Sequence, residues 1–432
     1  MAEQRRNLLN RTFSSLRTRN FRLFFFGQLI SNSGNWLTTV AITLLVLHRT
    51  GSGAGVGLLA VCQFGPLLVL SPFAGLIADR SNKRHLLYVT QGLEMLESFV
   101  LALLAFLPHS PLPAFYVTAL AGGALLAFDN PARRSFVNEM VKADDVPNAV
   151  TLYSAMNSLS RVIGPTIAGA LIVGLGYGWC FTIDGASYLV VLGALVAMRP
   201  AELRRAPQTR KGAGQVRAGL RYVMSVPELW ISFGMLLLIG TASYNFTVVL
   251  PLFVEHGLHG TDLQYTLVYA AFSGGGVLGT LIVARRTAIS VRTIVISAAL
   301  FGLAMFGLFL APTIDVAYPL AVLIGAASVS YMTATTAIAQ LRTRRDMIGR
   351  VLALQTVLLL GTTPIGGPIL GIVSDAAGGR SPVLVGAIAA VLAAFLGLLA
   401  ARRHQVASAP VPEQAEADPD TATEAPQDSP SD

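Results

Sequence analysis

Long apolar stretches recur along almost the whole chain and strongly limit what it can fold into. A helix needs about 20 apolar residues to cross the hydrocarbon core of a bilayer. Hydrophobic residues make up 53% of the chain and charged residues only 12%, more apolar surface than the core of a soluble domain can bury. The pattern predicts an all-α membrane protein with twelve transmembrane helices. The twelve stretches are residues 21–47, 54–78, 86–107, 112–129 (a short one), 147–175, 179–198, 230–253, 264–284, 291–310, 317–340, 351–374 and 381–400.

The lysine and arginine residues indicate the orientation in the membrane. If the N-terminus lies in the cytoplasm, the cytoplasmic segments hold 28 of the 31 Lys and Arg residues, as the positive-inside rule requires. The other three are Arg49 and Arg380 in outer loops and Arg161 within a span. The net charge of +8 therefore reports topology and does not indicate nucleic-acid binding. We expect both termini in the cytoplasm and a multi-pass protein of the inner (plasma) membrane.

The longest connection between spans divides the chain near its middle. This cytoplasmic linker, residues 199–229, is basic and includes an amphipathic stretch from Val216 to Val223. It separates an N-terminal bundle over residues 21–198 from a C-terminal bundle over residues 230–402. We expect two pseudo-symmetric six-helix bundles.

Similar glycine-proline segments occur at equivalent places in the two bundles. Gly164-Pro165-Thr166-Ile167-Ala168-Gly169 lies in the fifth span and Gly367-Pro368-Ile369-Leu370-Gly371 in the eleventh. Such repeats are typical of secondary transporters, although close helix packing also favours small residues and accounts for most of these glycines. The remaining segments are a cytoplasmic N-terminal segment, residues 1–20, and an acidic tail, residues 403–432, which we expect to be disordered.

Two motifs resemble a known family. The segment Gly75-Leu76-Ile77-Ala78-Asp79-Arg80-Ser81-Asn82-Lys83-Arg84 resembles the signature that the major facilitator superfamily carries between spans two and three, with Asn82 in place of a glycine. The segments from Phe128 to Arg134, from Asn148 to Val150 and from Ser160 to Pro165 resemble its transmembrane secretion effector branch. That branch includes enterobactin-type siderophore exporters and Tap-like multidrug efflux pumps. The second bundle departs from the pattern, because Ala284-Arg285-Arg286 has no counterpart of Asp79.

The resemblance implies a secondary active transporter that exports a drug, a siderophore or a secondary metabolite by alternating access. In the family, the signature aspartate locks the outward-open state at the N-terminus of span eleven, where the helix dipole favours an anion. The basic residues that follow it would bond neighbouring helices and Asp129, although a solvated basic loop explains Lys83 and Arg84 equally well. The implied gating residues are Gly75, Asp79, Arg80, Lys83, Arg84, Asp129 and Arg133.

Charged residues within spans are candidates for proton coupling. Arg161 lies near mid-depth, where a cation costs roughly 2.5–3.5 kcal/mol, so it should face a cavity or a partner. Glu94 and Glu97 share one face of the third span, and either could be that partner. Asp184 lies nearer the outer side and could simply satisfy a neighbour. For Arg161, Glu94 and Glu97 the alternative to proton coupling is a fixed structural ion pair, or glutamates that face a peripheral helix.

Polar and aromatic residues in the spans are candidates for a substrate cavity. The spacing of Gln28, Asn32, Asn35 and Thr39 places them on one face of the first span. Such a stripe suits either a cavity or a hydrogen-bonded seam between helices, and we favour the cavity because first helices line it in this fold. The other candidates, which would form an aromatic pocket for amphipathic molecules, are Trp36, Tyr244, Asn245, Tyr331 and Thr335.

Several function classes find little support in the sequence. Cys62 and Cys180 lie far apart in apolar stretches, and we expect no disulfide. Glu255-His256-Gly257-Leu258-His259 is interpreted as a loop, and we expect no metal site. Without a phosphate-binding loop or convergent catalytic residues, neither ATP hydrolysis nor an enzyme is expected. We expect no cofactor, a proton gradient as the driving force, a small-molecule substrate and a monomer; a non-transporting sensor or scaffold of the same fold is the alternative.

Overall fold

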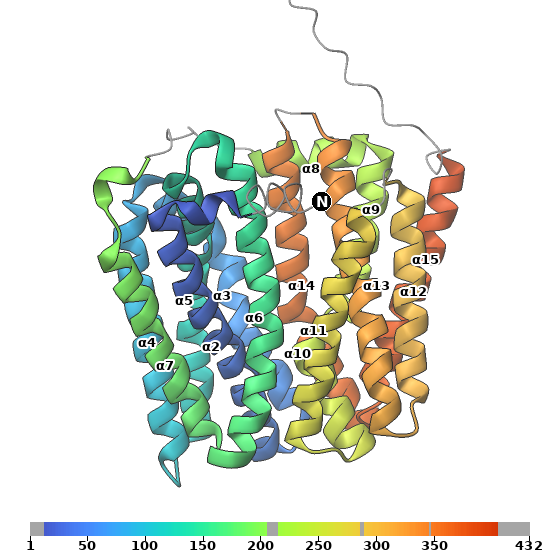
Figure 1. Ribbon diagram of the computed structural model, residues 1–432. Helices are drawn as coiled ribbons and strands as arrows, with labels where there is room; N and C mark the ends of the chain where they lie inside the picture. The colour runs from blue at the N-terminus through green and yellow to red at the C-terminus, as the bar shows by residue number, and fades with distance from the viewer. Residues whose placement is uncertain (1–12, 205–214, 286–288, 345–346, 405–432) are drawn as a thin grey trace, which may run out of the picture.

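The computed structural model describes residues 13–204, 215–285, 289–344 and 347–404, apart from the side chains of Pro72, Asp79, Gln215, Val216, Ala284 and Leu360. Within these residues it contains twelve helical spans that are long and apolar enough to cross a membrane, as the sequence predicts. They stand side by side in two groups (Figure 1). Residues 405–432 of the predicted acidic tail lie outside the described residues.

The first group contains six long helices. Their bounds are α2 Arg19–Thr50, α3 Gly53–Arg80, α4 Lys83–Phe106, α5 Leu112–Met140, α6 Val146–Leu175 and α7 Tyr177–Ala197. Short 3-10 turns, η1 Ser14–Arg17, η2 Ala143–Asp145 and η3 Pro200–Glu202, lie at the cytoplasmic end. We call this group the first bundle.

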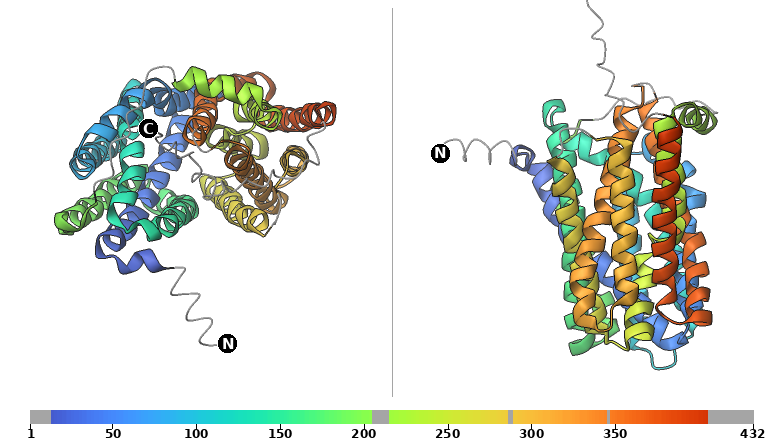
Figure 2. Two further views of the ribbon diagram at one scale, coloured as in Figure 1. Left: turned by 90° about the horizontal axis from the view of Figure 1, so that it is seen from above. Right: turned by 90° about the vertical axis from the view of Figure 1, so that its right-hand side faces the viewer.

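The second bundle follows a short amphipathic helix, α8 Gln215–Ser225, which contains the whole of the stretch noted in the linker. Figure 2 shows α8 lying across the cytoplasmic end of the spans, at a steep angle to them. The spans of the second bundle are α9 Pro227–Ala242 continued by α10 Phe246–Leu252, then α11 Asp262–Ala284, α12 Val291–Leu310, α13 Ile314–Leu341, α14 Ile348–Ala377 and α15 Ser381–Arg403.

The helix pairings of the two bundles correspond. In the first bundle α2 packs on α6 and α7, α3 on α5, and α4 on α7. In the second bundle α9 packs on α14 and α15, α11 on α13, and α12 on α15. Two further pairs join the bundles, α3 with α14 and α6 with α11. Large apolar side chains on the outward faces, such as Leu103 and Leu303, are exposed and suit contact with lipid.

One span is longer than expected. The fourth was predicted at residues 112–129, with the following basic residues in a cytoplasmic loop. Helix α5 instead has 29 residues and ends at Met140. It continues because Arg133, whose charge suggested a loop, is buried and paired inside the bundle.

The seventh span is broken in its middle. Helix α9 ends at Ala242 and α10 begins at Phe246. The side-chain amide of Asn245 donates to the carbonyl oxygen of Thr241 at 2.7 Å and to that of Gly240 at 3.4 Å. Asn245 therefore satisfies carbonyl groups that the break leaves without their helical partners.

Candidate functional site

An ion pair in α5 forms the centre of a buried polar cluster in the first bundle. The Arg133 guanidinium pairs with Asp129, one helical turn earlier, and both are buried. Asp129 Oδ1 also accepts hydrogen bonds from Thr90 Oγ1 at 2.8 Å and from Gln91 Nε2 at 2.9 Å, both on α4. The cluster holds α4 and α5 together and keeps this ion pair away from lipid.

Helix α2 supplies neutral acceptors to the same guanidinium. Arg133 donates to Gln28 Oε1 at 2.8 Å and to Asn32 Oδ1 at 2.5 Å. Asn32 Nδ2 donates in turn to Asn157 Oδ1 of α6 at 2.9 Å. Gln28 and Asn32 therefore form a hydrogen-bonded seam between helices, the alternative reading of the polar stripe, and the expectation that they line a cavity is wrong.

The other half of the stripe behaves differently. Asn35 and Thr39 are half-buried, and the Thr39 hydroxyl donates to the Asn35 carbonyl oxygen at 2.8 Å. That hydrogen bond stays within α2 and uses the backbone of Asn35, so it does not involve the Asn35 side-chain amide. The candidate cavity face of α2 is thus limited to the part around these two residues.

Glu94 belongs to the Arg133 cluster. Its Oε2 lies 3.6 Å from the Arg133 guanidinium and accepts a hydrogen bond from Gln91 at 2.9 Å. Its Oε1 is buried and has no hydrogen-bond partner among the described residues. Glu97, one turn further, lies elsewhere: its Oε1 would be 3.0 Å from a Cβ added at Gly122 of α5.

Asp184 on α7 is a further buried carboxyl group, outside the Arg133 cluster. Its Oδ2 accepts from Thr38 Oγ1 of α2 at 2.7 Å and from Ser98 Oγ of α4 at 2.8 Å. Its Oδ1 has no hydrogen-bond partner in the described part of the chain. Gly34 leaves room for this carboxyl group, because a Cβ there would lie 2.5 Å from Oδ1.

The sequence suggested Glu94 or Glu97 as the partner of Arg161. In the structure, Arg161 pairs with neither glutamate. It lies in the middle of α6 with an exposed side chain, and its guanidinium carbon is 5.1 Å from the centroid of the Trp36 ring on α2. Such a cation–π contact stabilises a guanidinium that keeps one face open. Depth along the helices suggested a pair with Glu97, but Arg161 lies over Trp36 of α2, whereas the Glu97 carboxyl group lies beside Gly122 of α5.

Aromatic rings continue from Trp36 into the second bundle. The Trp36 ring lies 6.1 Å from that of Tyr269 on α11, which lies 5.9 Å from Phe272. Phe272 lies 4.2 Å from Phe246 at the start of α10, and Phe246 lies 5.9 Å from Tyr244. The row crosses from the first bundle to the second between Trp36 and Tyr269, and it reaches the break in the seventh span at Phe246 and Tyr244.

The remaining cavity candidates lie at the far end of this row. The Tyr244 ring is 6.4 Å from that of Tyr331, and the Tyr244 hydroxyl donates to the carbonyl oxygen of Ser328. Tyr331 is fully buried, and its hydroxyl has no partner among the described residues. Thr335 is buried and donates to the Tyr331 carbonyl oxygen at 2.8 Å.

The signature segment forms the end of α3 and the start of α4. The side chain of Asp79 lies outside the described part, and a Cβ on Gly75 would meet open space. Lys83 pairs at 2.5 Å with Glu139 near the end of α5, and Arg80 is exposed. The expected bond from Lys83 to Asp129 is therefore replaced by one to Glu139.

Arg84 bonds a neighbouring helix, one of the two kinds of partner that the resemblance implies for it. Its guanidinium donates to the Leu195 carbonyl oxygen of α7 at 2.7 Å and to the Tyr88 hydroxyl at 3.2 Å. It therefore ties the start of α4 to the end of α7, a neighbouring helix, and does not contact Asp129, which bonds to Arg133 instead.

At the outer end, polar groups join the two bundles. Asp375 in the last turn of α14 accepts from Ser52 Oγ and Gly53 N at 2.6 Å and from Ala54 N at 3.0 Å, all at the start of α3. A second contact connects His48 near the end of α2 with acids of the second bundle. The sequence missed both, because each joins residues far apart in the chain.

Small residues let the bundles approach at this end. A Cβ on Gly371 would lie 2.1 Å from the Gly53 carbonyl oxygen, and one on Gly169 would lie 2.0 Å from Thr266 Oγ1 of α11. Only glycine permits such backbone approach, so these motif glycines serve packing between bundles.

The twelve-span fold in two matching bundles, with charged groups inside the first, defines a membrane-embedded secondary transporter and not an enzyme. The family model described as "Transmembrane secretion effector" matches residues 10–429. The chain belongs to this family of major facilitator transporters and is a multi-pass protein of the cytoplasmic membrane.

Characterised relatives cover most of the chain. A staphyloferrin A transporter of Staphylococcus aureus is 23% identical over 83% of this chain and 90% of its own length. A multidrug efflux pump, Tap, of Mycolicibacterium fortuitum is 27% identical over 82% of this chain and 89% of its own length. The crystal structure of a bacterial homologue of the human lysosomal transporter Spinster, in an inward-facing and unoccupied conformation, has a TM-score of 0.70. It is 16% identical and covers 90% of this chain and 99% of its own; at that identity it shows the fold alone.

Proposed function

We propose that the chain is a secondary active exporter of small molecules that works by alternating access and proton antiport. One observation carries the coupling proposal: the first bundle contains six buried charged residues, and carboxyl groups outnumber cations among them. Lys83 pairs with Glu139 and Arg133 with Asp129, which leaves two carboxyl groups in excess. The six residues are Lys83, Glu94, Asp129, Arg133, Glu139 and Asp184.

The two carboxyl groups in excess have features that suit proton carriers. An ionised carboxylate buried without its own cation is costly, whereas the protonated form is neutral. Glu94 Oε1 and Asp184 Oδ1 are the oxygens without hydrogen-bond partners, so each can hold a proton without breaking an existing bond. Rocking of the bundles that admits water to these oxygens would allow release. Glu97 is half-buried and remains a further candidate, while Arg161 has no acid within its described contacts and fits a different role.

That role is recognition of the substrate. The aromatic row offers ring faces at the junction of the bundles, and Arg161 places an exposed guanidinium beside its first ring. Ring faces bind flat apolar groups, and a guanidinium binds carboxylate or phosphate groups. We therefore propose amphipathic, partly aromatic molecules carrying an anionic group as the substrate class. The staphyloferrin A transporter and the multidrug efflux pump among the relatives are consistent with a small-molecule substrate of this kind.

Transport by the purified full chain in proteoliposomes tests the proposal. The substrates are two fluorescent dyes with similar aromatic bodies, one anionic and one cationic, and a pH gradient is imposed. We expect gradient-dependent transport of the anionic dye that a protonophore abolishes. Absence of transport for both dyes and for an iron-free carboxylate siderophore would favour the alternative of a non-transporting sensor or scaffold.

Variants separate coupling from binding. Glu94→Gln and Asp184→Asn should each bind dye normally but lose the response to the pH gradient, because the amides cannot exchange a proton. Asp315→Asn, an exposed residue at the outer end of α13, is the matched control and should behave as the unaltered protein. Full gradient-driven transport in the Glu94→Gln, Asp184→Asn double variant would refute coupling through these groups. Arg161→Gln should weaken binding of the anionic dye and leave the cationic dye unaffected.

A further inference from the structure

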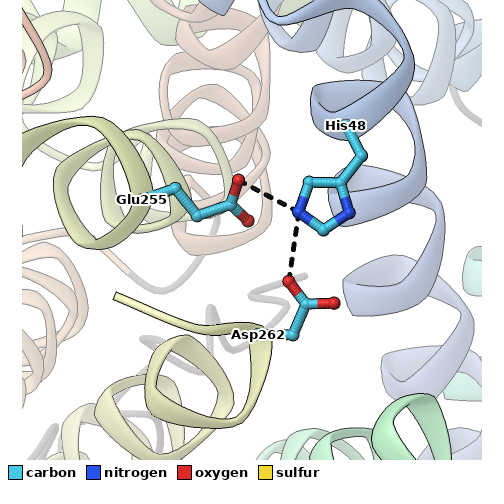
Figure 3. A group of neighbouring side chains, drawn as sticks. All are labelled: His48, Glu255 and Asp262. Carbon is cyan, nitrogen blue, oxygen red and sulfur yellow. Dashed lines mark ion pairs between the residues drawn. The ribbon is translucent and has the colours of Figure 1, made fainter. Parts of the chain in front are cut away.

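A polar cluster at the outer end of the bundles is not needed for the transport cycle described above. Its members are His48 near the end of α2, Glu255 in the π-helical turn η4 Phe253–Gly257, and Asp262, the first residue of α11 (Figure 3). His48 Nε2 lies 3.2 Å from Glu255 Oε2 and 3.2 Å from Asp262 Oδ1. We propose that these three side chains bind a divalent transition-metal ion of the zinc class and thereby join the two bundles.

The donor atoms fit such an ion. Zinc binds imidazole nitrogen and carboxylate oxygen at about 2.0–2.2 Å, usually in tetrahedral geometry. Two ligand atoms of a tetrahedral site are then about 3.3–3.5 Å apart, and His48 Nε2 lies 3.2 Å from both carboxylate oxygens. All three ligand atoms lie within 4.8 Å of one another. Imidazole and carboxylate groups are both zinc ligands, and three protein ligands leave the fourth position for water.

Tyr177, at the start of α7, orients the imidazole. Its hydroxyl lies 2.7 Å from His48 Nδ1 and donates to Asp262 Oδ2 at 2.8 Å. Since the hydroxyl has one proton and gives it to Asp262, its oxygen is left to accept the Nδ1 proton. Histidines that bind metals commonly donate their other ring N–H to such a partner. Tyr177 would therefore hold both His48 and Asp262 in position.

With its Nδ1 proton donated to Tyr177, His48 needs a proton or a metal ion at Nε2. With Nδ1 protonated, the neutral ring would direct the Nε2 lone pair at two carboxylate oxygens, an arrangement of three acceptors with no donor. Either a proton on Nε2 or a metal ion removes the conflict. A doubly charged ion compensates both carboxylates, whereas the proton supplies a single positive charge.

The site is accessible from the outer side. It opens into a cavity of about 540 Å³ whose lining includes His48, Glu255 and Asp262 together with His256 and His259. The side chain of His48 is 44% exposed, whereas that of Glu255 is 11% exposed, and Glu255 Oε1 is buried without a partner among the described residues. An ion can therefore enter from the outer side and reach the largely buried carboxylate of Glu255.

The two bundles contribute different ligands, and this predicts an effect on transport. His48 and Tyr177 belong to the first bundle, and Glu255 and Asp262 to the second. Outward opening must separate them and break the metal coordination. A bound ion should therefore stabilise the conformation that is closed on the outer side and slow the transport cycle.

Calorimetric titration of the purified full chain in nanodiscs with zinc chloride tests the binding. We expect one zinc ion per chain, and more than about tenfold weaker binding in both His48→Ala and Glu255→Gln. His109→Ala, which changes another histidine of the outer side, is the matched control and should bind zinc unchanged. Magnesium chloride should bind far more weakly, because magnesium prefers oxygen ligands. Absence of zinc binding, or equal binding in both site variants, would overturn the proposal.

A second measurement tests the effect on the outer end. Thr266 is buried beneath Gly169 at the contact between α11 and α6. A Thr266→Cys reporter, in a chain with Cys62 and Cys180 replaced by serine, should react with a membrane-impermeant thiol reagent only when the outer end opens. Zinc should slow this reaction in the reporter chain but not when His48→Ala is added. Equal reaction rates with and without zinc, in a chain shown to bind it, would contradict the link between the site and closure.

Discussion

Replacement of Asp375 is expected to loosen the closure of the outer end. This carboxylate of the second bundle accepts three hydrogen bonds from the first residues of α3, at 2.6 to 3.0 Å. Two of the donors, Gly53 N and Ala54 N, are backbone groups that have no partner within the helix. Asp375 therefore caps a helix of the other bundle, and outward opening must remove this cap.

The magnitude follows from the charge and from the exposure of the contact. A carboxylate at an exposed helix N-terminus contributes about 0.3–1 kcal/mol, and each hydrogen bond to a charged group adds about 1.5–3 kcal/mol where water is excluded. Because this contact is partly exposed, water replaces much of that gain. We expect about 1 kcal/mol for Asp375→Asn and about 2 kcal/mol for Asp375→Ala, which shifts the equilibrium toward the open outer end about fivefold and about thirtyfold.

The Thr266→Cys reporter measures this shift. When opening and closing are fast compared with labelling, the labelling rate follows the open population. We expect rates about five and about thirty times higher, in that order, with Asp315→Asn as a control of equal charge change at the outer end. Unchanged or lower rates in both Asp375 variants would refute the idea that this cap stabilises outer closure.

Three further variants test other contacts. Gly371→Ala places a Cβ 2.1 Å from the Gly53 carbonyl oxygen, so it should force α3 and α14 apart and raise the reporter labelling rate; an unchanged rate would contradict this. Arg133→Ala leaves buried carboxylates unpaired and should lower stability by about 3–5 kcal/mol, seen as a fall in Tm that Asp129→Asn partly reverses; a Tm equal to that of the unaltered chain would contradict this. Trp36→Ala removes the first ring of the aromatic row and should weaken dye binding by about 0.5–1.5 kcal/mol, or about two- to twelvefold, in a fluorescence titration.

The fold was predictable because its signal is local. Twelve apolar stretches and the distribution of Lys and Arg need no knowledge of contacts, and the structure confirms all twelve spans. The error at the end of the fourth span has the opposite cause. Arg133 alone indicates a loop, and only its pairing with Asp129 and the acceptors on α2 makes burial possible.

The partners of the site residues were less predictable. The depth of a residue along its helix can be predicted from the sequence, but the neighbouring helix that its side chain faces cannot. Arg161 and Glu97 were placed at similar depth, yet Arg161 lies over Trp36 and Glu97 over Gly122. The sequence of Glu255–His259 indicated only a loop. The contact of Glu255 with His48 could not be predicted, because His48 belongs to the other bundle.

The outer cap on α3 also has a counterpart in the sequence at the opposite face of the membrane. Helices α3 and α14 pack together, and the hydrogen bond from Gly53 to Asp375 shows that the start of α3 lies beside the end of α14. Asp375 lies in the last turn of α14, and Asp79 occupies the last turn of α3. As the superfamily signature implies, we expect Asp79 to act at the start of α14 when the cytoplasmic end is closed.

Each acid would then cap the partner helix on one face, and rocking would exchange one cap for the other. Because similar contacts are lost and gained, neither state is strongly favoured, as a transporter that must visit both requires. Asp79→Asn should therefore lower the Thr266→Cys labelling rate, Asp375→Asn should raise it, and the double variant should return toward the rate of the unaltered reporter chain. Shifts of both single variants in the same direction would contradict this exchange, because two caps that act in opposite states cannot both favour the same one.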